Sequence, residues 1–323
     1  MYDLIIIGGG PAGVAAGVYA SRKKLKTLFL TESFGGQSIV SEGIENWIGT
    51  IKISGNDLAK SLEAHLRAYA ADIVDIKTGS WVQSVEKLPV ENTAGEVGGH
   101  VFKVSLAPKK GATEPETFLS HAILIATGSK RRKLEAIGAD KFEHKGVTYC
   151  ATCDGPMFSD QDVFVVGGGN AAFESAAQLA AYCKSVTIIN RSASYRADPV
   201  TVEKILAKEN VNSLTDTIIE EVTGDTFVSG IRIKNTVTGE IKELPTTGVF
   251  VEIGLLPNTD FIGNLVERDE YNKIKVDHRT QSTSQPGIWS AGDCTDGLYH
   301  QNNIAAGDAV KALEDIYVYV SKK

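Results

Sequence analysis

Short, continuous apolar runs recur along the chain, and two of them end in a cluster of glycines. Residues 3–9 read DLIIIGG, and residues 162–168 read DVFVVGG. Uninterrupted apolar residues predict parallel strands that are covered on both faces. Each run is followed by a helix-like stretch of small and apolar residues, and then by another apolar run, at 25–32 and at 185–190. This repeated order of strand, helix and strand predicts an α/β fold.

The glycines after the two runs have the spacing of a dinucleotide-binding loop. Residues 8–13 read GGGPAG, and residues 167–172 read GGGNAA. Such glycines let the backbone approach a pyrophosphate, whose charge is stabilised by the N-terminus of the following helix. Glu32 ends the strand after the first loop, where an acid can bind a ribose. Two complete copies of this unit imply two dinucleotides.

The rest of the chain completes this picture. Residues 73–121 are rich in polar and β-branched residues and predict a small antiparallel ribbon, and residues 122–129 predict a further buried strand. The segments at 248–258 and 287–296 are interpreted as late strands that return to the first domain. The chain closes with a predicted helix at about 303–320.

Composition narrows the classes of partner. The chain has 323 residues, a net charge of −7 and a pI near 5.5, which argues against nucleic acid and anionic membranes as general partners. We expect no signal peptide and no membrane span, and therefore a cytoplasmic protein. Structural disulfides are rare in that compartment, so a Cys-x-x-Cys pair indicates redox catalysis or metal binding.

Cys150 and Cys153 form such a pair in the segment CATCDG. A zinc site normally needs a second pair of ligands, whereas Cys183 and Cys294 are isolated in the sequence and no close pair of histidines accompanies them. We therefore expect no metal. We expect a helix to begin after the two cysteines, where its N-terminus would stabilise a thiolate.

In these residues the chain resembles the low-molecular-weight thioredoxin reductases, and it is also similar to the reductase module of the alkyl hydroperoxide reductase flavoprotein. The resemblance covers nearly the whole chain and rests on motifs that follow one another in the same order: GGGPAG at 8–13, GGQ at 35–37, ENW at 45–47, ATG at 126–128, CATCDG at 150–155, GGGNAA at 167–172, GLLPNT at 254–259 and AGDC at 291–294.

The resemblance implies two Rossmann-like domains in the pyridine nucleotide-disulfide oxidoreductase architecture. An FAD-binding domain would comprise residues 1–129 and 247–323, and an inserted NAD(P)H-binding domain, residues 130–246, would carry the cysteine pair. The inserted domain would rotate about hinges near 129–133 and 244–247 to present the dithiol or the nicotinamide to the flavin in turn. The family analogy also suggests a homodimer.

The resemblance further implies which residues bind the two cofactors. For FAD these are Gly8, Gly10, Pro11, Ala12, Gly13, Glu32, Gly36, Gln37, Asn46, Ala126, Thr127, Gly128, Gly292, Asp293 and Gln301. For the nicotinamide dinucleotide they are Gly167, Gly169, Asn170, Ala171, Arg191 and Arg196. In the dithiol, Cys153 would face the flavin, Cys150 would exchange with the substrate disulfide, and Asp154 would act as acid and base.

The choice between NADPH and NADH stays open. NADPH-using relatives follow the second strand with His-Arg-Arg and a further Arg, which bind the 2′-phosphate. Here Arg191 and Arg196 match two of the arginines, but Asn190 and Ser192 replace the other residues. An NADH enzyme would favour an acid at position 190. NADPH, NADH and a different reductant all remain candidates.

The leading function is an FAD-dependent reductase that passes electrons from NAD(P)H through Cys150 and Cys153 to thioredoxin or a similar small dithiol protein. One alternative is an NADH-dependent reductase of a peroxiredoxin-system or glutaredoxin-like carrier, with the carrier expected as a separate chain. Another is a small-molecule dithiol oxidase. A ferredoxin–NADP reductase and a non-catalytic scaffold are disfavoured, because neither accounts for the sequence Cys-x-x-Cys-Asp.

Overall fold

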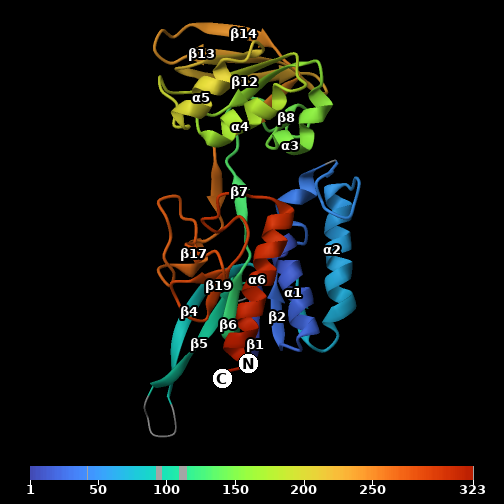
Figure 1. The fold of residues 1–323 in the computed structure, drawn as a ribbon, viewed down its shortest axis with the longest axis vertical. Helices are drawn as coiled ribbons and strands as arrows, with labels where there is room; N and C mark the ends of the chain where they lie inside the picture. Colours follow the sequence, from blue (N-terminus) through green and yellow to red (C-terminus); the bar gives the residue numbers. More distant parts are fainter. Residues whose placement is uncertain (42, 92–96, 109–114, 323) are drawn as a thin grey trace. The chain divides into compact units, whose positions relative to one another are not determined.

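The computed structural model describes residues 1–41, 43–91, 97–108 and 115–322. The chain forms two compact units (Figure 1). Unit 1 comprises Met1–Lys130 and Leu256–Lys323, and unit 2 comprises Arg131–Leu255. Unit 2 is thus one continuous segment inserted into the chain of unit 1.

Unit 1 is built on a mainly parallel sheet whose central strand is β1 (Tyr2–Ile7). This strand pairs in parallel with β2 and β6 on its two sides. The full strand order is β17 (Val276–Asp277), β18 (Ser282–Thr283), β19 (Ile288–Ser290), β6 (Thr117–Ile125), β1, β2 (Thr27–Leu30) and β3 (Val74–Lys77), and β4 (Val82–Glu91) and β5 (Val97–Leu106) form an antiparallel ribbon joined to β6.

The prediction of an antiparallel ribbon over residues 73–121 is therefore correct only in part. The pair β4 and β5 is antiparallel, as expected, but β3 pairs in parallel with β2 and belongs to the main sheet.

The described helices of unit 1 are α1 (Pro11–Arg22), α2 (Gly55–Ala70) and α6 (Asn302–Val320). Two short 3₁₀ turns, η1 (Gly36–Val40) and η3 (Asp260–Ile262), accompany them.

Both faces of the central sheet are covered, as the continuous apolar run of β1 predicts. Leu4 and Ile6 are buried in a core with α1, α2 and α6, whereas Ile5 and Ile7 are buried in a second core with the β4–β5 ribbon. Figure 1 shows α1 and α6 side by side along one face of this sheet. The carboxyl end of β1 therefore lies between two hydrophobic cores, and the glycine loop that leads into α1 follows it.

Unit 2 repeats the parallel architecture with a smaller sheet. Its strands run in the order β11 (Val211–Leu214), β10 (Ser185–Ile189), β9 (Asp162–Val166), β15 (Gly248–Val251) and β8 (Val147–Thr148). The helices are α3 (Ala151–Asp154), α4 (Asn170–Leu179) and α5 (Pro199–Leu206), with the 3₁₀ turn η2 (Gly155–Phe158). A separate antiparallel sheet consists of β12 (Thr217–Gly224), β13 (Val228–Asn235) and β14 (Ile241–Pro245).

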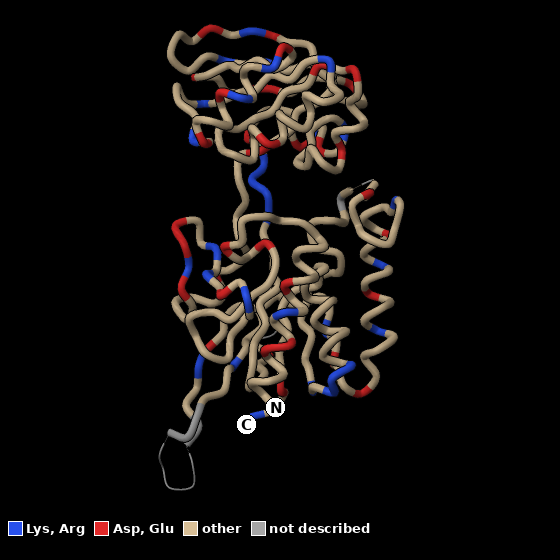
Figure 2. Tube along the Cα trace, in the orientation of Figure 1, with Lys and Arg blue, Asp and Glu red and all other residues tan. Residues whose placement is uncertain are grey.

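The chain leaves unit 2 later than the sequence suggested. Residues 248–251 were expected to return to the first domain, but they form β15, which pairs in parallel with β9 and β8. The connections between the units are β7 (Ser129–Arg131) and β16 (Leu255–Pro257), which pair with each other. The first connection continues into the basic run 130–133, a blue stretch in Figure 2, and is mostly exposed.

Candidate functional site

The first glycine loop is tightly folded between β1 and α1. Gly8 has φ +122°, and a Cβ there would fall 2.1 Å from the carbonyl oxygen of Ala126. A Cβ at Gly13 would fall 1.8 Å from the carbonyl oxygen of Gly8. Any side chain at either position would collide with backbone, so these two glycines are required by the close packing of the loop.

The N-terminus of α1 is open to a ligand. Its N-cap, Gly10, provides no side-chain hydrogen bond, and Pro11 occupies the first turn. A Cβ at Gly10 would meet only the Cα of Gly36, 3.9 Å away, so two bare glycine backbones face the same space. Free N–H groups, a positive helix end and open space fit the pyrophosphate of a dinucleotide. Ala12 is buried behind this loop, and the exposed Glu32 follows β2.

The predicted residues of η1, the loop around residue 46 and the start of α6 lie together. The Asn46 side-chain amide donates to Gln301 Oε1 over 3.1 Å, and Asn303 Nδ2 donates to the carbonyl oxygen of Asn46 over 2.7 Å. Gln37 Nε2 donates to Ser129 Oγ over 3.3 Å. Asn303 was not among the predicted site residues, although two asparagines directly follow Gln301 in the sequence.

Two further predicted segments line the carboxyl edge of the unit 1 sheet. Thr127 Oγ1 donates to the carbonyl oxygen of Asn258 over 2.7 Å, and the Asn258 amide donates back over 3.1 Å. This reciprocal pair fixes the backbone before Gly128, which has φ +60° and open space around it. Asn258 was not among the predicted site residues, although it lies inside the GLLPNT motif.

Asp293 is half-buried beside His300. The two side chains form an ion pair if the imidazole is protonated, with 3.6 Å between Nδ1 and Oδ1. Lys273 Nζ lies 3.1 Å from the other ring nitrogen of His300. Gly292 has φ +78°, and a Cβ there would fall 3.2 Å from Ala305 Cβ and 3.5 Å from Ala12 Cβ, so this segment lies near the first glycine loop.

The second glycine loop has the same design in unit 2. Gly167 has φ +150°, and a Cβ there would fall 2.3 Å from the carbonyl oxygen of Glu252. Gly169, the N-cap of α4, makes no side-chain hydrogen bond and has nothing within 4 Å of an added Cβ. Asn170 Oδ1 accepts from the backbone of Asp198 over 2.8 Å, and Ala171 is exposed on the first turn of α4. This open helix start also fits a phosphate.

Asn190 shapes the loop that follows β10. It is buried, and its side-chain nitrogen donates to the carbonyl oxygens of Ser192 and Ser194 over 2.7 and 2.9 Å. Its amide is therefore used inside the protein, not offered to a ribose. Arg191 and Arg196 are exposed, and no ion pair of either is found among the described parts of the chain. Their guanidinium groups suit an anion such as a ribose phosphate.

The cysteine pair lies in unit 2 between β8 and α4. Cys150 and Cys153 form a disulfide, with 5.3 Å between their Cα atoms. The prediction that a helix begins after both cysteines is wrong. The helix α3 begins between them, at Ala151, with Cys150 as its N-cap. The backbone N–H of Cys153 donates to Cys150 Sγ over 3.2 Å. Asp154 follows in the same turn, and its carboxylate accepts a hydrogen bond from Thr148 Oγ1.

Burial raises the pKa of three further groups, Cys183, Cys294 and Glu252. Burial raises the pKa of the Cys183 thiol to about 11 and also raises the pKa of Cys294, which fits packing roles for both. Burial likewise raises the pKa of Glu252 to about 7, against a smaller opposing effect of the hydrogen bond from Ser175 Oγ, 2.7 Å long. Glu252 was not among the predicted site residues.

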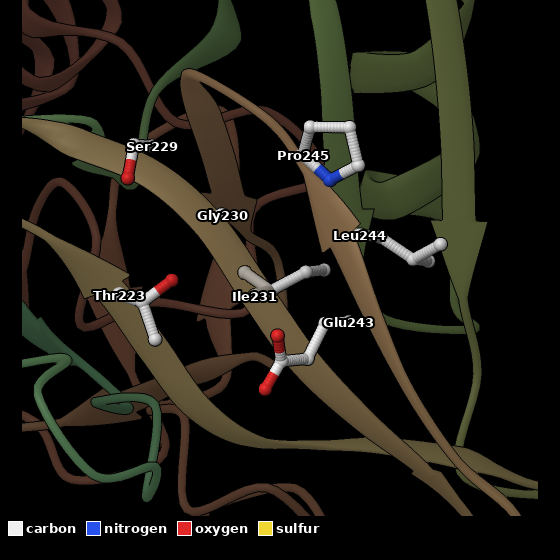
Figure 3. A pocket seen from close by; sticks show the side chains of 7 residues that line it. All are labelled: Thr223, Ser229, Gly230, Ile231, Glu243, Leu244 and Pro245. Carbon is white, nitrogen blue, oxygen red and sulfur yellow. The ribbon is translucent and has the colours of Figure 1, made fainter.

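A shallow pocket lies on the antiparallel sheet of unit 2 (Figure 3). It contains none of the predicted site residues, and Glu243 is the ionisable side chain in its lining. The pocket is lined by Thr223, Ser229, Gly230, Ile231, Glu243, Leu244 and Pro245. Its chemistry gives no reason to relate it to either glycine loop.

The family model of the pyridine nucleotide-disulphide oxidoreductases matches residues 2–309 of the chain. The chain belongs to this family. The predicted fold class is confirmed, and the flavoprotein oxidoreductases of this family use FAD and NAD(P)H, in agreement with the predicted cofactors.

Among curated relatives of this chain, "NADH dehydrogenase" of Bacillus subtilis (strain 168) is 35% identical over 321 residues. An alkyl hydroperoxide reductase protein of Escherichia coli (strain K12) is 37% identical over 320 residues. Each match covers 99% of this chain and 58% of the relative. The chain therefore spans somewhat more than half the length of these relatives.

Solved structures give the same family at full length. A thioredoxin reductase from Streptococcus pyogenes MGAS5005 is 32% identical with a TM-score of 0.85, and the match covers 100% of this chain and 99% of that one. The thioredoxin reductase from Giardia duodenalis is 32% identical with a TM-score of 0.86 over 99% of each chain. The resemblance to thioredoxin reductases is confirmed.

The described residues also show neither a metal-binding cluster nor a membrane-spanning helix. Within residues 1–41, 43–91, 97–108 and 115–322, no cluster of His, Cys, Asp and Glu could hold a metal ion. Over the same ranges, every helix is too short or too polar to cross a membrane.

Proposed function

We propose that the chain is an FAD-dependent disulfide reductase that transfers electrons from NAD(P)H through Cys150 and Cys153 to a small dithiol protein, with thioredoxin as the leading candidate. The observation that supports this most directly is the half-buried disulfide with Asp154 in the same helical turn. This disulfide lies on the unit that also carries the second glycine loop. The natural setting would be the cytoplasm, and the enzyme would act as a homodimer.

FAD would be held by unit 1. Its pyrophosphate would lie at the N-terminus of α1, against the backbone of Gly8, Gly10 and Gly13. The exposed Glu32 would bind its ribose. The remaining predicted contacts come from the same edge of the sheet and the start of α6: Pro11, Ala12, Gly36, Gln37, Asn46, Ala126, Thr127, Gly128, Gly292, Asp293 and Gln301. When bound there, FAD would supply the two electrons needed to reduce the disulfide.

Unit 2 would hold the nicotinamide cofactor. Gly167 and Gly169 would take its pyrophosphate at the start of α4, together with Asn170 and Ala171. A 2′-phosphate, if present, would lie against the exposed guanidinium groups of Arg191 and Arg196. Because Asn190 is committed to its own loop, neither a ribose-binding acid nor a third arginine is available at the strand end.

The cysteine pair and Asp154 would carry out the thiol chemistry. When two electrons enter the disulfide, its S–S bond breaks, one sulfur is left as a thiolate and the other takes up a proton. Cys153 would receive the electrons, Cys150 would attack the partner disulfide, and Asp154 would transfer protons between sulfur and solvent. The net reaction consumes NAD(P)H, one proton and the partner disulfide, and yields NAD(P)⁺ and the partner dithiol.

A second candidate keeps this chemistry and changes the partner. The similarity to the alkyl hydroperoxide reductase protein, at 37% identity, favours an NADH-dependent reductase of a peroxiredoxin-system or glutaredoxin-like carrier. A small-molecule dithiol oxidase is less well supported, because the second glycine loop keeps the open helix start that a nicotinamide cofactor needs.

One experiment separates these candidates. The purified protein is reduced anaerobically with NADH or NADPH, flavin absorbance is followed, and thioredoxin or a peroxiredoxin-system carrier is then added. Reoxidation by thioredoxin supports the leading proposal, and reoxidation only by the other carrier supports the second. Cys153→Ser is expected to abolish reoxidation while flavin reduction persists, whereas Cys150→Ser is expected to give a long-wavelength charge-transfer band. A band in Cys153→Ser alone would reverse the two roles, and a protein that binds no FAD would overturn the proposal.

A further inference from the structure

Thr148 is a buried hydroxyl beside the acid of the cysteine pair. It is 4% exposed and ends β8, whose pairing with β15 sets Thr148 opposite Phe250. Its Oγ1 donates a hydrogen bond to Oδ2 of Asp154, six residues further along the chain. The contact joins the sheet to the four-residue helix α3 that contains Cys153.

We propose that Thr148 is a positioning residue for proton transfer at the disulfide, acting through Asp154. The inference rests on the proposed function, in which Asp154 transfers protons for Cys150 and Cys153. Thr148 takes no direct part in that chemistry, but its hydroxyl lies on a buried strand and can hold the carboxylate of Asp154 in one place.

The geometry leaves Asp154 with one tethered and one available oxygen. An ionised carboxylate only accepts hydrogen bonds, so the hydroxyl of Thr148 must be the donor to Oδ2. No second hydrogen bond to this carboxylate is found among the described residues, and Oδ1 therefore stays available for a proton. The backbone N–H of Asp154 also donates to the carbonyl oxygen of Cys150 over 3.0 Å. Backbone and side chain are thus both held with respect to the cysteine pair.

Substitution of Thr148 by valine or by serine distinguishes the effect of its hydroxyl from the effect of its side-chain shape. Thr148→Val keeps the branched shape but removes the donor, whereas Thr148→Ser keeps the donor and removes only a methyl group. Both are made as full-length, FAD-loaded protein, together with Asp154→Asn and the double variant Thr148→Val/Asp154→Asn. If Thr148→Val loses FAD, Thr148→Ala takes its place, because it removes the hydroxyl without adding bulk.

Two rates are measured for each protein: anaerobic reduction of the flavin by the nicotinamide cofactor, and turnover with a protein or small-molecule disulfide. Thr148→Val is expected to slow disulfide turnover by about tenfold or more, because it removes a hydrogen bond to a charged group. Flavin reduction is expected to be unchanged, and Thr148→Ser is expected to restore turnover. In the Asp154→Asn background, Thr148→Val is expected to cause no further loss, because its effect passes through Asp154.

The outcomes distinguish this inference from the function on which it rests. Equal losses from Thr148→Val with and without Asp154 would mean a general structural role and would overturn the inference. So would full activity of Thr148→Val when Asp154→Asn is impaired. If Asp154→Asn itself turns over disulfides normally, the proposed acid–base role fails first, and the role of Thr148 falls with it.

Discussion

Glu252 shows how a single residue can make stability depend on pH. Its half-buried carboxyl accepts from Ser175, and the charged groups near it are Arg131 and Glu174. Burial raises its pKa from the ordinary 4.5 to about 7. Because the folded protein holds this proton more tightly than the unfolded chain, its stability falls as the pH rises from about 4.5 to 7.

Glu252→Gln is therefore expected to stabilise the protein above pH 7. A pKa difference of this size corresponds to about 3 kcal/mol in the free energy of unfolding, present at pH 8 and nearly absent at pH 4.5. The glutamine oxygen can still accept from Ser175. Unfolding would be followed by urea titration at pH 5 and pH 8, with the exposed Glu203→Gln on α5 as the control. An equal effect of Glu252→Gln at both pH values would contradict this explanation.

At the same scale, the predicted site residues rest on local sequence patterns, which do not reveal all of the contacts that these residues make in the fold. The glycines were recognisable because their spacing reflects a local backbone requirement, as the close contacts of Gly8 and Gly13 show. Thr148, Asn258 and Glu252 were missed because their importance comes from contacts with residues distant in the sequence. Asn190 was noted only because it replaces a histidine or an acid at the strand end, and the sequence did not reveal that its amide organises its own loop.

Among the elements, we expect the loop between β10 and α5 to decide how strongly unit 2 binds a 2′-phosphate. Asn190 fixes the backbone at Ser192 and Ser194, and the side chains of both serines are exposed. An arginine at position 192 could therefore join Arg191 and Arg196 without displacing buried groups. The loop as it stands has two cations and lacks a third.

Ser192→Arg is expected to raise the preference for NADPH over NADH by about ten- to a hundredfold, the effect of one hydrogen bond to a charged group. The gain should shrink as salt concentration rises, because the loop is exposed. The measurement is the ratio of kcat/KM for the two cofactors. Ser194→Arg, which adds the same charge elsewhere on the loop, is the matched control and should change the ratio less. An unchanged ratio in Ser192→Arg would mean that this loop does not bind the phosphate.

Elements were predicted better than their assignment to a sheet. The strands that lead into both glycine loops are where the apolar runs indicated. β15 was assigned to the wrong unit because a buried parallel strand is apolar on both faces in either sheet, so its sequence does not specify its neighbours. The helix at the cysteines was placed too late because α3 is only four residues long, too short for a periodic pattern.

Over the whole molecule, the buried apolar residues separate by unit. Among the described residues, two hydrophobic cores draw their members from unit 1, and two more draw theirs from Arg131–Leu255 alone. The main sheet of unit 1, by contrast, needs both parts of its chain, since β19 pairs with β6 and α6 packs on α1.

Residues 131–255 are therefore expected to fold when expressed alone, with a cooperative thermal transition in circular dichroism. Residues 1–130 alone are expected to aggregate or stay unfolded, because they lack β19 and α6. The intact chain serves as the reference for both fragments. A molten, non-cooperative 131–255 fragment would show that its two cores do not suffice.

The pairing of β7 with β16 has a consequence for how such a chain can be assembled from genes. The Arg132 N–H donates to the carbonyl oxygen of Gly254 over 3.1 Å, so the two ends of the inserted unit are neighbours. The Asn258 N–H donates to the carbonyl oxygen of Gly128 over 3.0 Å, so the cut ends of the host are neighbours too. A coding segment with adjacent ends can be excised, replaced or circularly permuted as a cassette, leaving a host gap that a short turn can close.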